Sequence, residues 1–415
     1  MPRKIRLPRL RLPRLRLAPI ALTAATLLLA LPAFAQPPSQ PPSQSQPPSQ
    51  LQPPSQPPAL ALKDAFAKDF LIGAALERSF YNGTNPARSA LVVSQFNAVT
   101  PEIAMMWQFI HPGENRYDFA SADRCVDFAA KHGMVVSGHM LVWHQLTPAW
   151  VFQNADGSPA SRETLLARMR DHIHTIVGRY KGRVKNWDVV NEALDDDGSL
   201  RDTPWRRIIG DDYIEQAFRF AHEADPDAEL YYNDWGIETG KRLEGALTLL
   251  RKLKTAGAPI TAIGMQEHVN LDYPAAKDVD KAIATFGRLG LKVLITELDV
   301  DVLPRTPEMD EANIDITRVK KTRPEDNPYV AGLPAGEQEK LARRYAELFA
   351  VYLKHRDVIE SVTFWGVTDR ETWLNNWPVS GRTNHPLLFD REATPKPAFY
   401  AVLKTARPKP PAPPQ

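Results

Sequence analysis

Eight short runs of apolar and β-branched residues recur along the chain, and longer amphipathic segments separate them. One such segment, residues 162–180, carries apolar residues three and four positions apart, which is the spacing of a helix with one buried face. The strand-length runs begin at Phe70, Phe96, Val135, Val184, Glu229, Ala262, Lys292 and Ser361. Apolar strands that alternate with helices indicate a parallel sheet covered by helices. Eight such units predict an α/β fold, a single-domain (β/α)8 TIM barrel.

The alternation of apolar strands with helices is also compatible with an open, doubly wound sheet. A dinucleotide-binding sheet of that kind carries a glycine-rich phosphate loop after its first strand. No such loop follows the first run, FLIGAAL at residues 70–76. We therefore expect the closed barrel.

The first 35 residues predict a cleaved secretory leader. Seven lysines and arginines precede an apolar run at residues 17–31, and the small-residue sequence Ala-Phe-Ala ends the leader at Ala35. A membrane anchor is less favoured, because the run is shorter than the roughly 20 residues that a span needs and contains Pro19. We expect an exported protein, periplasmic or extracellular, with no membrane attachment after cleavage.

Proline-rich segments flank the predicted domain. Residues 36–59 consist largely of PPSQ repeats, which bury too little apolar surface to fold and predict a disordered linker. Residues 407–415 resemble this linker and predict a similar tail. The predicted catalytic domain therefore spans residues 60–406.

Charge and cysteine content narrow the possible partners. The formal charge of +2 falls to −5 when the seven positive charges of the leader are removed, so nothing indicates a nucleic-acid partner. The single cysteine, Cys125, cannot form an internal disulfide, and an exported domain without disulfides must depend on a large core. We expect a monomer.

Polar and aromatic residues gather at the carboxyl ends of the predicted strands, where barrels carry their active sites. Along the chain these are Glu102 after the second strand, His139, Trp143 and His144 in the third, Asn191 and Glu192 after the fourth, Asn233 and Trp235 after the fifth, Gln266 and His268 after the sixth, Glu297 and Asp299 after the seventh, and Trp365 and Trp373 at and beyond the eighth. Any one of them alone would be an ordinary solvated or core residue. Their coincidence at seven strand ends predicts a functional site.

Two glutamates form the centre of this predicted site. Glu192 and Glu297 each follow a hydrophobic run, in WDVVNEAL and VLITELDV. Such a pair suits glycoside hydrolysis, in which one carboxyl group donates a proton to the leaving oxygen and the other opposes the positive charge at the anomeric carbon. Tryptophan rings suit stacking against sugars, and the amides and imidazoles suit holding hydroxyl groups.

Five stretches of the sequence carry a family resemblance: GHMLVWHQLTPAW, WDVVNEAL, GMQEHV, ITELDV and TFWGVTDRETWLNNWP. They resemble glycoside hydrolase family 10, the retaining endo-β-1,4-xylanases, and the similarity spans residues 60–405. The resemblance implies an endo-1,4-β-xylanase that acts on xylan or xylo-oligosaccharides and needs no metal or other cofactor.

The resemblance also implies a role for each site residue. Glu192 matches the acid/base, Glu297 the nucleophile, and Asn191 the residue that bonds the 2-hydroxyl of the sugar being cleaved. His268 and Asp299 match the pair that steadies the nucleophile. The expected substrate-binding residues are Glu102, His139, Trp143, Asn191, Asn233, Trp235, Gln266, His268, Trp365 and Trp373.

These roles define a double displacement that retains configuration and needs the two carboxyl groups about 5 to 5.5 Å apart. Glu297 is expected to stay ionised and to attack the anomeric carbon. Its charge, together with partial burial, is expected to raise the pKa of Glu192, which then donates a proton to the leaving group and later accepts one from water.

The sequence departs from the family on the non-reducing side of the scissile bond. The family motif resembles Thr-Pro-Glu-Asn-x-Met-Lys-Trp, and here Ile103 replaces its Asn and Met106 replaces its Lys. Neither residue donates a hydrogen bond, so sugar binding there is expected to weaken by roughly tens- to thousands-fold.

Two hypotheses account for this departure. In the first, the protein is a xylanase that holds its substrate mainly on the leaving-group side, through residues 303–336 and the loop NNWPVSGRTNHPLLF. In the second, the pocket suits a different glycoside with a bulkier or less hydroxylated unit. We favour the first, since the rest of the predicted wall fits the family.

Readings from other classes are less consistent with the sequence. A non-catalytic carbohydrate-binding barrel would need the stacking residues but not both glutamates. A metal-dependent barrel hydrolase could use His139, His144, His268 and Asp299 as ligands. No His-x-His pair stands at a strand end, however, and the tryptophans would then have no role.

Overall fold

The computed structural model describes residues 61–305, 320–321 and 324–406, all within one compact unit, Pro57–Gln415. The main sheet contains β1 (Leu71–Leu76), β2 (Ala98–Pro101), β3 (Val135–Gly138), β4 (Asn186–Asn191), β5 (Glu229–Asp234), β6 (Ala262–Met265), β7 (His268–Asn270), β8 (Lys292–Asp301) and β10 (Ile359–Phe364). Its order is β10-β1-β2-β3-β4-β5-β6-β8-β7, and β10 also pairs with β8. All these pairings are parallel, so eight strands close into the predicted barrel, and β7 lies outside the ring against β8.

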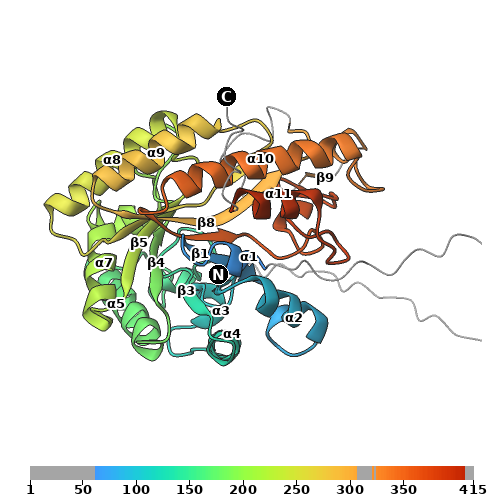
Figure 1. The fold of residues 1–415 in the computed structure, drawn as a ribbon. Coiled ribbons are helices and arrows are strands. Elements are labelled where there is room, and N and C mark those ends of the chain that lie inside the picture. The colour runs from blue at the N-terminus through green and yellow to red at the C-terminus, as the bar shows by residue number, and fades with distance from the viewer. Residues whose placement is uncertain (1–60, 306–319, 322–323, 407–415) are drawn as a thin grey trace, which may run out of the picture. The chain divides into compact units, whose positions relative to one another are not determined.

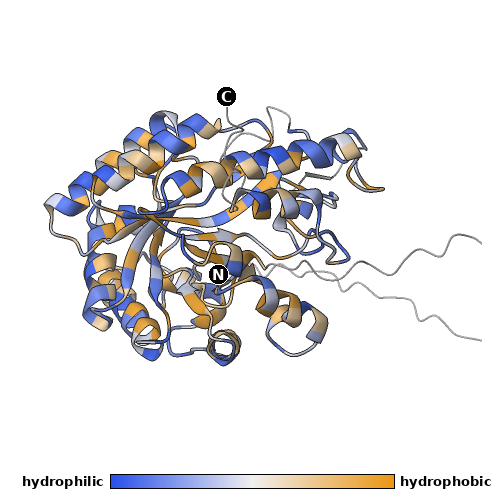
Figure 2. Ribbon diagram, viewed as in Figure 1, coloured by the Kyte–Doolittle hydropathy of each residue, from blue (hydrophilic) through white to orange (hydrophobic). Residues whose placement is uncertain are grey.

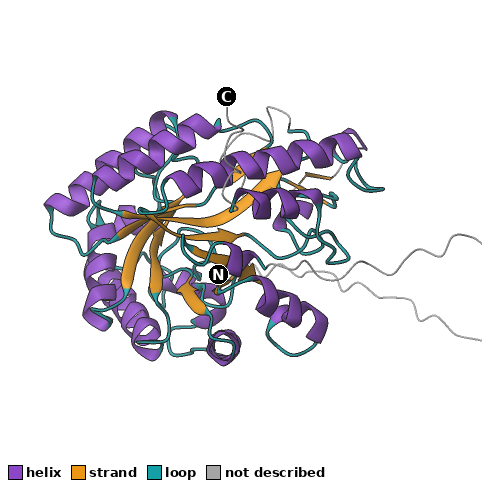
Figure 3. Cartoon of the chain, viewed as in Figure 1, coloured by secondary structure: helices purple, strands orange, loops and turns teal. Residues whose placement is uncertain are grey.

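Helices cover the outside of the strands (Figures 1 and 3). They are α1 (Leu62–Ala65), α2 (Pro86–Gln95), α3 (Trp107–Ile110), α4 (Ala120–Lys131), α5 (Arg162–Arg179), α6 (Pro204–Ile209), α7 (Tyr213–Ala224), α8 (Gly240–Thr255), α9 (Ala276–Arg288), α10 (Ala335–Lys354) and α11 (Pro397–Thr405). A short second sheet pairs β9 (Lys320–Lys321) with β11 (Val379–Ser380).

Local sequence explains where the helices begin and which face they bury. The side chain of Ser161 accepts a hydrogen bond from the Thr164 backbone N–H and so caps α5, and Asn85 caps α2 through the Arg88 N–H. Hydrophobic and hydrophilic residues alternate along each helix (Figure 2), and the buried ones of α5 recur at helical spacing from Leu165 onward. The main core therefore lies between the strands and the helices.

The third strand is shorter than predicted. It ends at Gly138, whereas the apolar run continues to Trp143. A Cβ atom at Gly138 would lie 2.1 Å from the Trp187 ring, so only glycine allows this close approach of β3 to β4. The next peptide, His139–Met140, is cis, and the contact with β4 continues through a hydrogen bond from the Leu141 N–H to the Asp188 carbonyl and an isolated bridge from Val142. His139, Trp143 and His144 therefore follow the strand and do not lie in it.

Two further predictions of strand limits were wrong. The sixth run forms two strands, β6 and β7, because Glu267 between them adopts a left-handed backbone conformation with φ of 60°. Asn191, Asn233, Glu297 and Asp299 lie inside β4, β5 and β8 and not after these strands, and β8 continues past the barrel to pair with β7. All four side chains still belong to the carboxyl-terminal parts of their strands.

Several predictions concern segments outside the described residues. These are the leader at 1–35, the linker at 36–59, the tail at 407–415 and part of the segment 303–336. Among the residues that the structure does describe, no helix has the length and apolar character to cross a membrane. Cys125 is free and buried in the core.

Candidate active site

The two central glutamates reach the site from strands that are not neighbours, because β5 and β6 lie between β4 and β8 in the barrel. Glu192 directly follows β4, and its backbone adopts a left-handed conformation with φ of 54°. Such a conformation is uncommon for a residue with a Cβ atom and is found most often where function constrains the backbone. Glu297 projects from β8 and is 5% exposed.

Glu192 accepts three hydrogen bonds. Trp143 Nε1 donates to its Oε2 at 3.1 Å, while Gln266 Nε2 at 3.2 Å and Asn191 Nδ2 at 3.3 Å donate to its Oε1. Burial, and then the charges of Asp234 and Glu297, raise the pKa of Glu192 to about 7. The direction agrees with the sequence-based expectation, but burial contributes more than Glu297. The carboxyl group is therefore suited to donate a proton near neutral pH.

Glu297 is held on both of its oxygens. Asn233 Nδ2 donates to Oε1 at 2.7 Å, and His268 Nε2 lies 3.1 Å from Oε2. The other ring nitrogen of His268 lies 3.0 Å from Asp299 Oδ1, and Trp373 Nε1 donates to Asp299 Oδ2 at 2.7 Å. Burial opposes the charged form of His268, but Asp299 and Glu297 outweigh it and raise its pKa to about 10. A protonated His268 donates to both carboxylates and fixes Glu297 in place.

Asparagine and glutamine side chains connect the two glutamates. Asn191 Oδ1 accepts from Gln266 Nε2 at 3.0 Å and from Asn233 Nδ2 at 3.1 Å. Because Gln266 also bonds Glu192 and Asn233 also bonds Glu297, a continuous set of hydrogen bonds joins the two carboxyl groups. Five predicted residues from β4 and the position after it, β5, the β6–β7 connection and β8 thus meet in one network.

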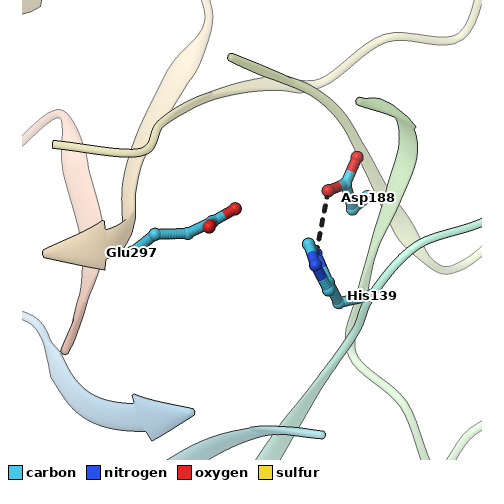
Figure 4. Close-up of side chains that lie close together, drawn as sticks. All are labelled: His139, Asp188 and Glu297. Atoms are coloured by element: carbon cyan, nitrogen blue, oxygen red, sulfur yellow. Dashed lines mark hydrogen bonds and ion pairs between the residues drawn. The ribbon is translucent and has the colours of Figure 1, made fainter. Parts of the chain in front are cut away.

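A second group lies beside Glu297 and includes a residue that sequence reasoning missed. His139 Nδ1 lies 3.1 Å from Asp188 Oδ2, and the side chains of His139 and Glu297 point toward one another (Figure 4). Asp188 is fully buried in β4 and also accepts from Asn233 at 3.1 Å. Burial, the largest effect, raises the pKa of Asp188 to about 6. A charged residue between the apolar residues Trp187 and Val189 was the signal that could have identified it.

The metal-hydrolase reading is not supported by the positions of its proposed ligands. In the described residues, His139, Asp188 and Glu297 form the one group of three His, Cys, Asp or Glu side chains whose ligand atoms all lie within 4.8 Å of one another. His144 is absent from this group, and burial, followed by Arg201, lowers its pKa to about 3. His268 instead contacts Asp299 and Glu297 directly. These side chains are arranged for hydrogen bonding to one another.

The remaining predicted residues occupy the rim. Trp365 stands edge-on to His139, with ring centroids 5.1 Å apart, so both contribute to the same wall. Burial, then Glu77, raises the pKa of Glu102 to about 7; His139 and Glu297 also act on this carboxyl, which places it near the site. Trp235 lies under the guanidinium of Arg242, 3.8 Å from the ring centroid, so one face of its ring is covered by protein.

The two residues that depart from the family differ in exposure. The Ile103 side chain is 42% exposed, which is unusual for a large apolar residue, whereas Met106 is 6% exposed. Both lie in the short segment between β2 and α3, directly after Glu102. Ile103 therefore adds an exposed apolar side chain to this segment, whereas Met106 adds almost no surface.

Comparisons with known proteins give a consistent result. Residues 61–405 match the model of glycosyl hydrolase family 10. Endo-1,4-beta-xylanase A of Xylanibacter ruminicola is 43% identical over 343 residues, which cover 83% of this chain and 92% of that protein. Endo-1,4-beta-xylanase of Geobacillus stearothermophilus is 42% identical over 347 residues, which cover 83% of this chain and 98% of that protein.

Solved structures agree with these relatives. A GH10 endoxylanase retrieved from a sugarcane soil metagenome is 44% identical, with a TM-score of 0.80, over 83% of this chain and 99% of that one. Xylanase XynB of Paenibacillus barcinonensis, complexed with a conduramine derivative, is 40% identical, with a TM-score of 0.74, over 83% of this chain and 98% of that one.

Proposed function

Because the chain belongs to glycosyl hydrolase family 10, we propose that it is an endo-1,4-β-xylanase, which hydrolyses internal β-1,4-xylosidic bonds of xylan and retains the anomeric configuration. The observation that carries this proposal is the hydrogen-bonded network that contains both Glu192 and Glu297. The network gives the two carboxyl groups different environments, as the two roles of a glycosidase require.

In the first step Glu297 attacks the anomeric carbon and the bond to the leaving oxygen breaks. Glu192, with its pKa of about 7, transfers its proton to that oxygen. Hydrogen bonds from Asn233 and His268 orient the Glu297 carboxylate before attack. This orientation lowers the entropic part of the activation barrier for the attack. A covalent glycosyl-enzyme results.

In the second step a water molecule attacks the same carbon and Glu297 leaves. Glu192, now ionised, accepts the proton of that water, so each catalytic group returns to its starting state. Asn191 donates to Glu192 in the free protein and is the residue that we assign to the sugar 2-hydroxyl. Trp143, Trp365 and His139 form the wall around the sugar that is cleaved.

Substitution of the two glutamates tests these roles. Glu297→Ala is expected to abolish turnover of xylan and of aryl xylobiosides alike. Glu192→Ala is expected to lower the rate on xylan by about 10²- to 10⁴-fold. Formation of the glycosyl-enzyme from a dinitrophenyl xylobioside should remain fast, because that leaving group needs no proton. Full activity of Glu192→Ala on xylan would disprove the acid assignment, and turnover by Glu297→Ala would place the nucleophile elsewhere.

A second candidate function rests on the apolar segment at Ile103 and Met106. The exposed Ile103 side chain favours a β-glycosidase whose non-reducing subsites accept a less hydroxylated or bulkier unit. We favour the xylanase. Rates on xylan, an aryl xyloside and an aryl cellobioside, compared between the wild type and an Ile103→Asn, Met106→Lys double variant, separate the two. No gain on xylan in the double variant would contradict the loss of binding that we assign to these residues.

We also propose that the protein is exported and acts as a monomer on xylan or xylo-oligosaccharides. The predicted leader supports export. Amino-terminal sequencing of the protein recovered outside the cytoplasm should begin at Gln36, and sedimentation should give the mass of one chain. Recovery of the uncleaved protein in the cytoplasm would contradict the proposal on localisation.

A further inference from the structure

Two buried glutamates that the mechanism does not use lie directly behind the active site. Glu267 stands between Gln266 and His268 and is 1% exposed, and Glu238, in the loop between β5 and α8, is 4% exposed. Within the described residues, Oε1 of each has no hydrogen-bond partner. Buried carboxyl oxygens are normally satisfied, so this pair needs an explanation.

Glu267 sits at an irregular step in the backbone. In a regular strand, successive carbonyls point to opposite sides. Here the carbonyls of Gln266 and Glu267 both accept from β8, the first from the Glu297 N–H at 3.0 Å and the second from the Asp299 N–H at 3.4 Å. The left-handed conformation of Glu267 makes this possible. This conformation is strained for a residue with a Cβ atom, so the surroundings of its side chain must hold it.

This step positions the supports of both catalytic groups. The residue before Glu267 donates to Glu192, and the residue after it contacts Glu297 and Asp299. A small rotation at Glu267 would therefore displace Gln266 and His268 together. The Glu267 side chain itself points away from the network, toward α10, where Tyr352 donates to its Oε2 at 3.4 Å.

The charges around the pair do not balance if both carboxyl groups ionise. Arg344 of α10 is the cation that faces Glu267, and its guanidinium also donates to the backbone oxygens of Asn270 and Pro274. The other nearby cations are already engaged, since Arg242 pairs with Asp234 and His268 with Glu297 and Asp299. Arg344 acts on Glu267, and the already paired Arg242 and His268 act on Glu238, so ionisation of both carboxyl groups would leave negative charge in the interior without a cation of its own for each.

We propose that Glu238 and Glu267 form a pair of positioning residues that keeps a proton at neutral pH and thereby holds the 266–268 turn, and with it the supports of Glu192 and Glu297, in its active arrangement. The proposal rests on the proposed function, because it assigns the pair to that active site. Loss of the last proton would place two repelling negative charges behind the turn and loosen it.

Burial and the neighbouring charges support this assignment. Burial, followed by Asp234, raises the pKa of Glu238 to about 7, while Arg242 and His268 oppose the shift. Burial, followed by Glu238, raises the pKa of Glu267 well above its usual range, while Arg344 and Tyr352 oppose it. The pair therefore keeps a proton to higher pH than ordinary carboxyl groups do.

The test measures kcat/KM from pH 5 to 10 on a dinitrophenyl xylobioside. Its dinitrophenolate leaving group needs no proton from Glu192. In the wild type this rate should fall at alkaline pH. Glu267→Gln and Glu238→Gln each remove one charge while keeping the shape, and each should move the midpoint of the fall upward by about one pH unit, which is about tenfold in relative rate above the midpoint. The double variant should move it no further than either single variant.

A matched control is available at the other end of the barrel. Glu229 and Glu360 form a second close carboxyl pair, and burial, followed by Glu360, raises the pKa of Glu229 to about 7. Glu229 begins β5, far along the strand from the catalytic rim. Glu229→Gln should therefore leave the alkaline midpoint unchanged. An unchanged midpoint in both Glu267→Gln and Glu238→Gln would overturn the proposal.

A readout without substrate separates this proposal from the proposed function. A carboxyl group whose pKa is raised in the folded protein lowers the free energy of unfolding as pH rises. The decrease begins at the unfolded pKa, near 4.3, and ends above the folded pKa. The difference in Tm between Glu267→Gln and the wild type should therefore become more positive from pH 5 to pH 8. A constant difference would show that Glu267 is already ionised and would overturn the pair, whether or not xylan is the substrate.

Discussion

At the scale of single residues, the environment decides what each carboxyl group does. Glu192 and Glu297 are chemically identical, yet one accepts from Trp143 and Gln266 and the other from Asn233 and from a charged imidazole. The sequence identified both glutamates and most of their partners, because these residue types stand at strand ends. It did not identify Asp188, since contacts inside a barrel depend on three-dimensional packing that periodicity does not contain.

The pH dependence of kcat/KM on xylan should reveal the effect of the hydrogen bond from Trp143 to Glu192. The N–H of this residue stabilises the ionised form of Glu192, so Trp143→Phe should raise the pKa of Glu192 above about 7 and move the alkaline fall of kcat/KM upward by up to about one unit. Trp373→Phe is the control, because its N–H reaches Asp299 instead. It should lower the rate without moving the midpoint, and equal shifts in both variants would contradict this account.

Thermal unfolding at different pH values should reveal the charge on His268. Its folded pKa of about 10 exceeds the unfolded value near 6.5, so the stability from its contacts with Glu297 and Asp299 is fully present below pH 6.5 and is lost as pH rises through 10. The Tm of the wild type should exceed that of His268→Gln most at pH 6, and the gap should close toward pH 10. A gap that widens with pH would contradict the assigned charge.

At the scale of strands and helices, periodicity predicted the order of elements but not where each one ends. All eight barrel strands were found at the predicted runs. The end of β3 depends on a contact between Gly138 and the Trp187 ring, and the break between β6 and β7 depends on the backbone of Glu267. Both features depend on tertiary contacts, so the pattern of apolar residues in the sequence does not indicate where these strands end.

A glycine in β6 makes room for the network and gives a direct test of strand packing. A Cβ atom at Gly264 would lie 2.4 Å from Asn233 Oδ1, the side chain that bonds Glu297. Gly264→Ala should displace that amide, lower kcat on xylan by about 10- to 100-fold and lower the free energy of unfolding by about 1 to 3 kcal/mol.

The matched control is the same substitution in a helix. Gly178 lies in α5, is exposed, and would place a Cβ atom in open space. Gly178→Ala should leave kcat unchanged and raise the free energy of unfolding by about 0.5 to 1 kcal/mol. If both substitutions had the same effect, steric displacement of Asn233 would not explain the loss of activity.

At the scale of the whole molecule, one closed barrel agrees with the family match and brings Asn191, Glu192, Asn233, Gln266 and Glu297 into one hydrogen-bonded network. Alternation of eight strands with helices was sufficient to predict this architecture, because few other folds use that pattern. The family match covers residues 61–405, and the described part of the chain begins at residue 61 and reaches 406. The limits of the catalytic domain and the roles of its flanking segments remain predictions.

A fragment experiment tests those limits. Residues 60–406 alone should unfold at the same Tm as residues 36–415 and should hydrolyse soluble xylan with the same kcat/KM, because the predicted linker and tail contribute no apolar surface to the core. Thermal unfolding and reducing-sugar release measure the two quantities. A lower Tm for the fragment would place part of the flanking sequence in the folded domain.

Closure of the ring has a consequence for synthesis of the chain. Residues of β10 pair with both β1 and β8, so the first and last strands of the barrel meet only when the carboxyl-terminal part of the protein is available. While the ribosome is still at work, those two neighbours present unpaired edges, which are the surfaces through which incomplete chains aggregate. A message truncated before the codon for Ile359 should thus give an insoluble product, even though Glu192 and Glu297, to which we assign the chemistry, would already have been made.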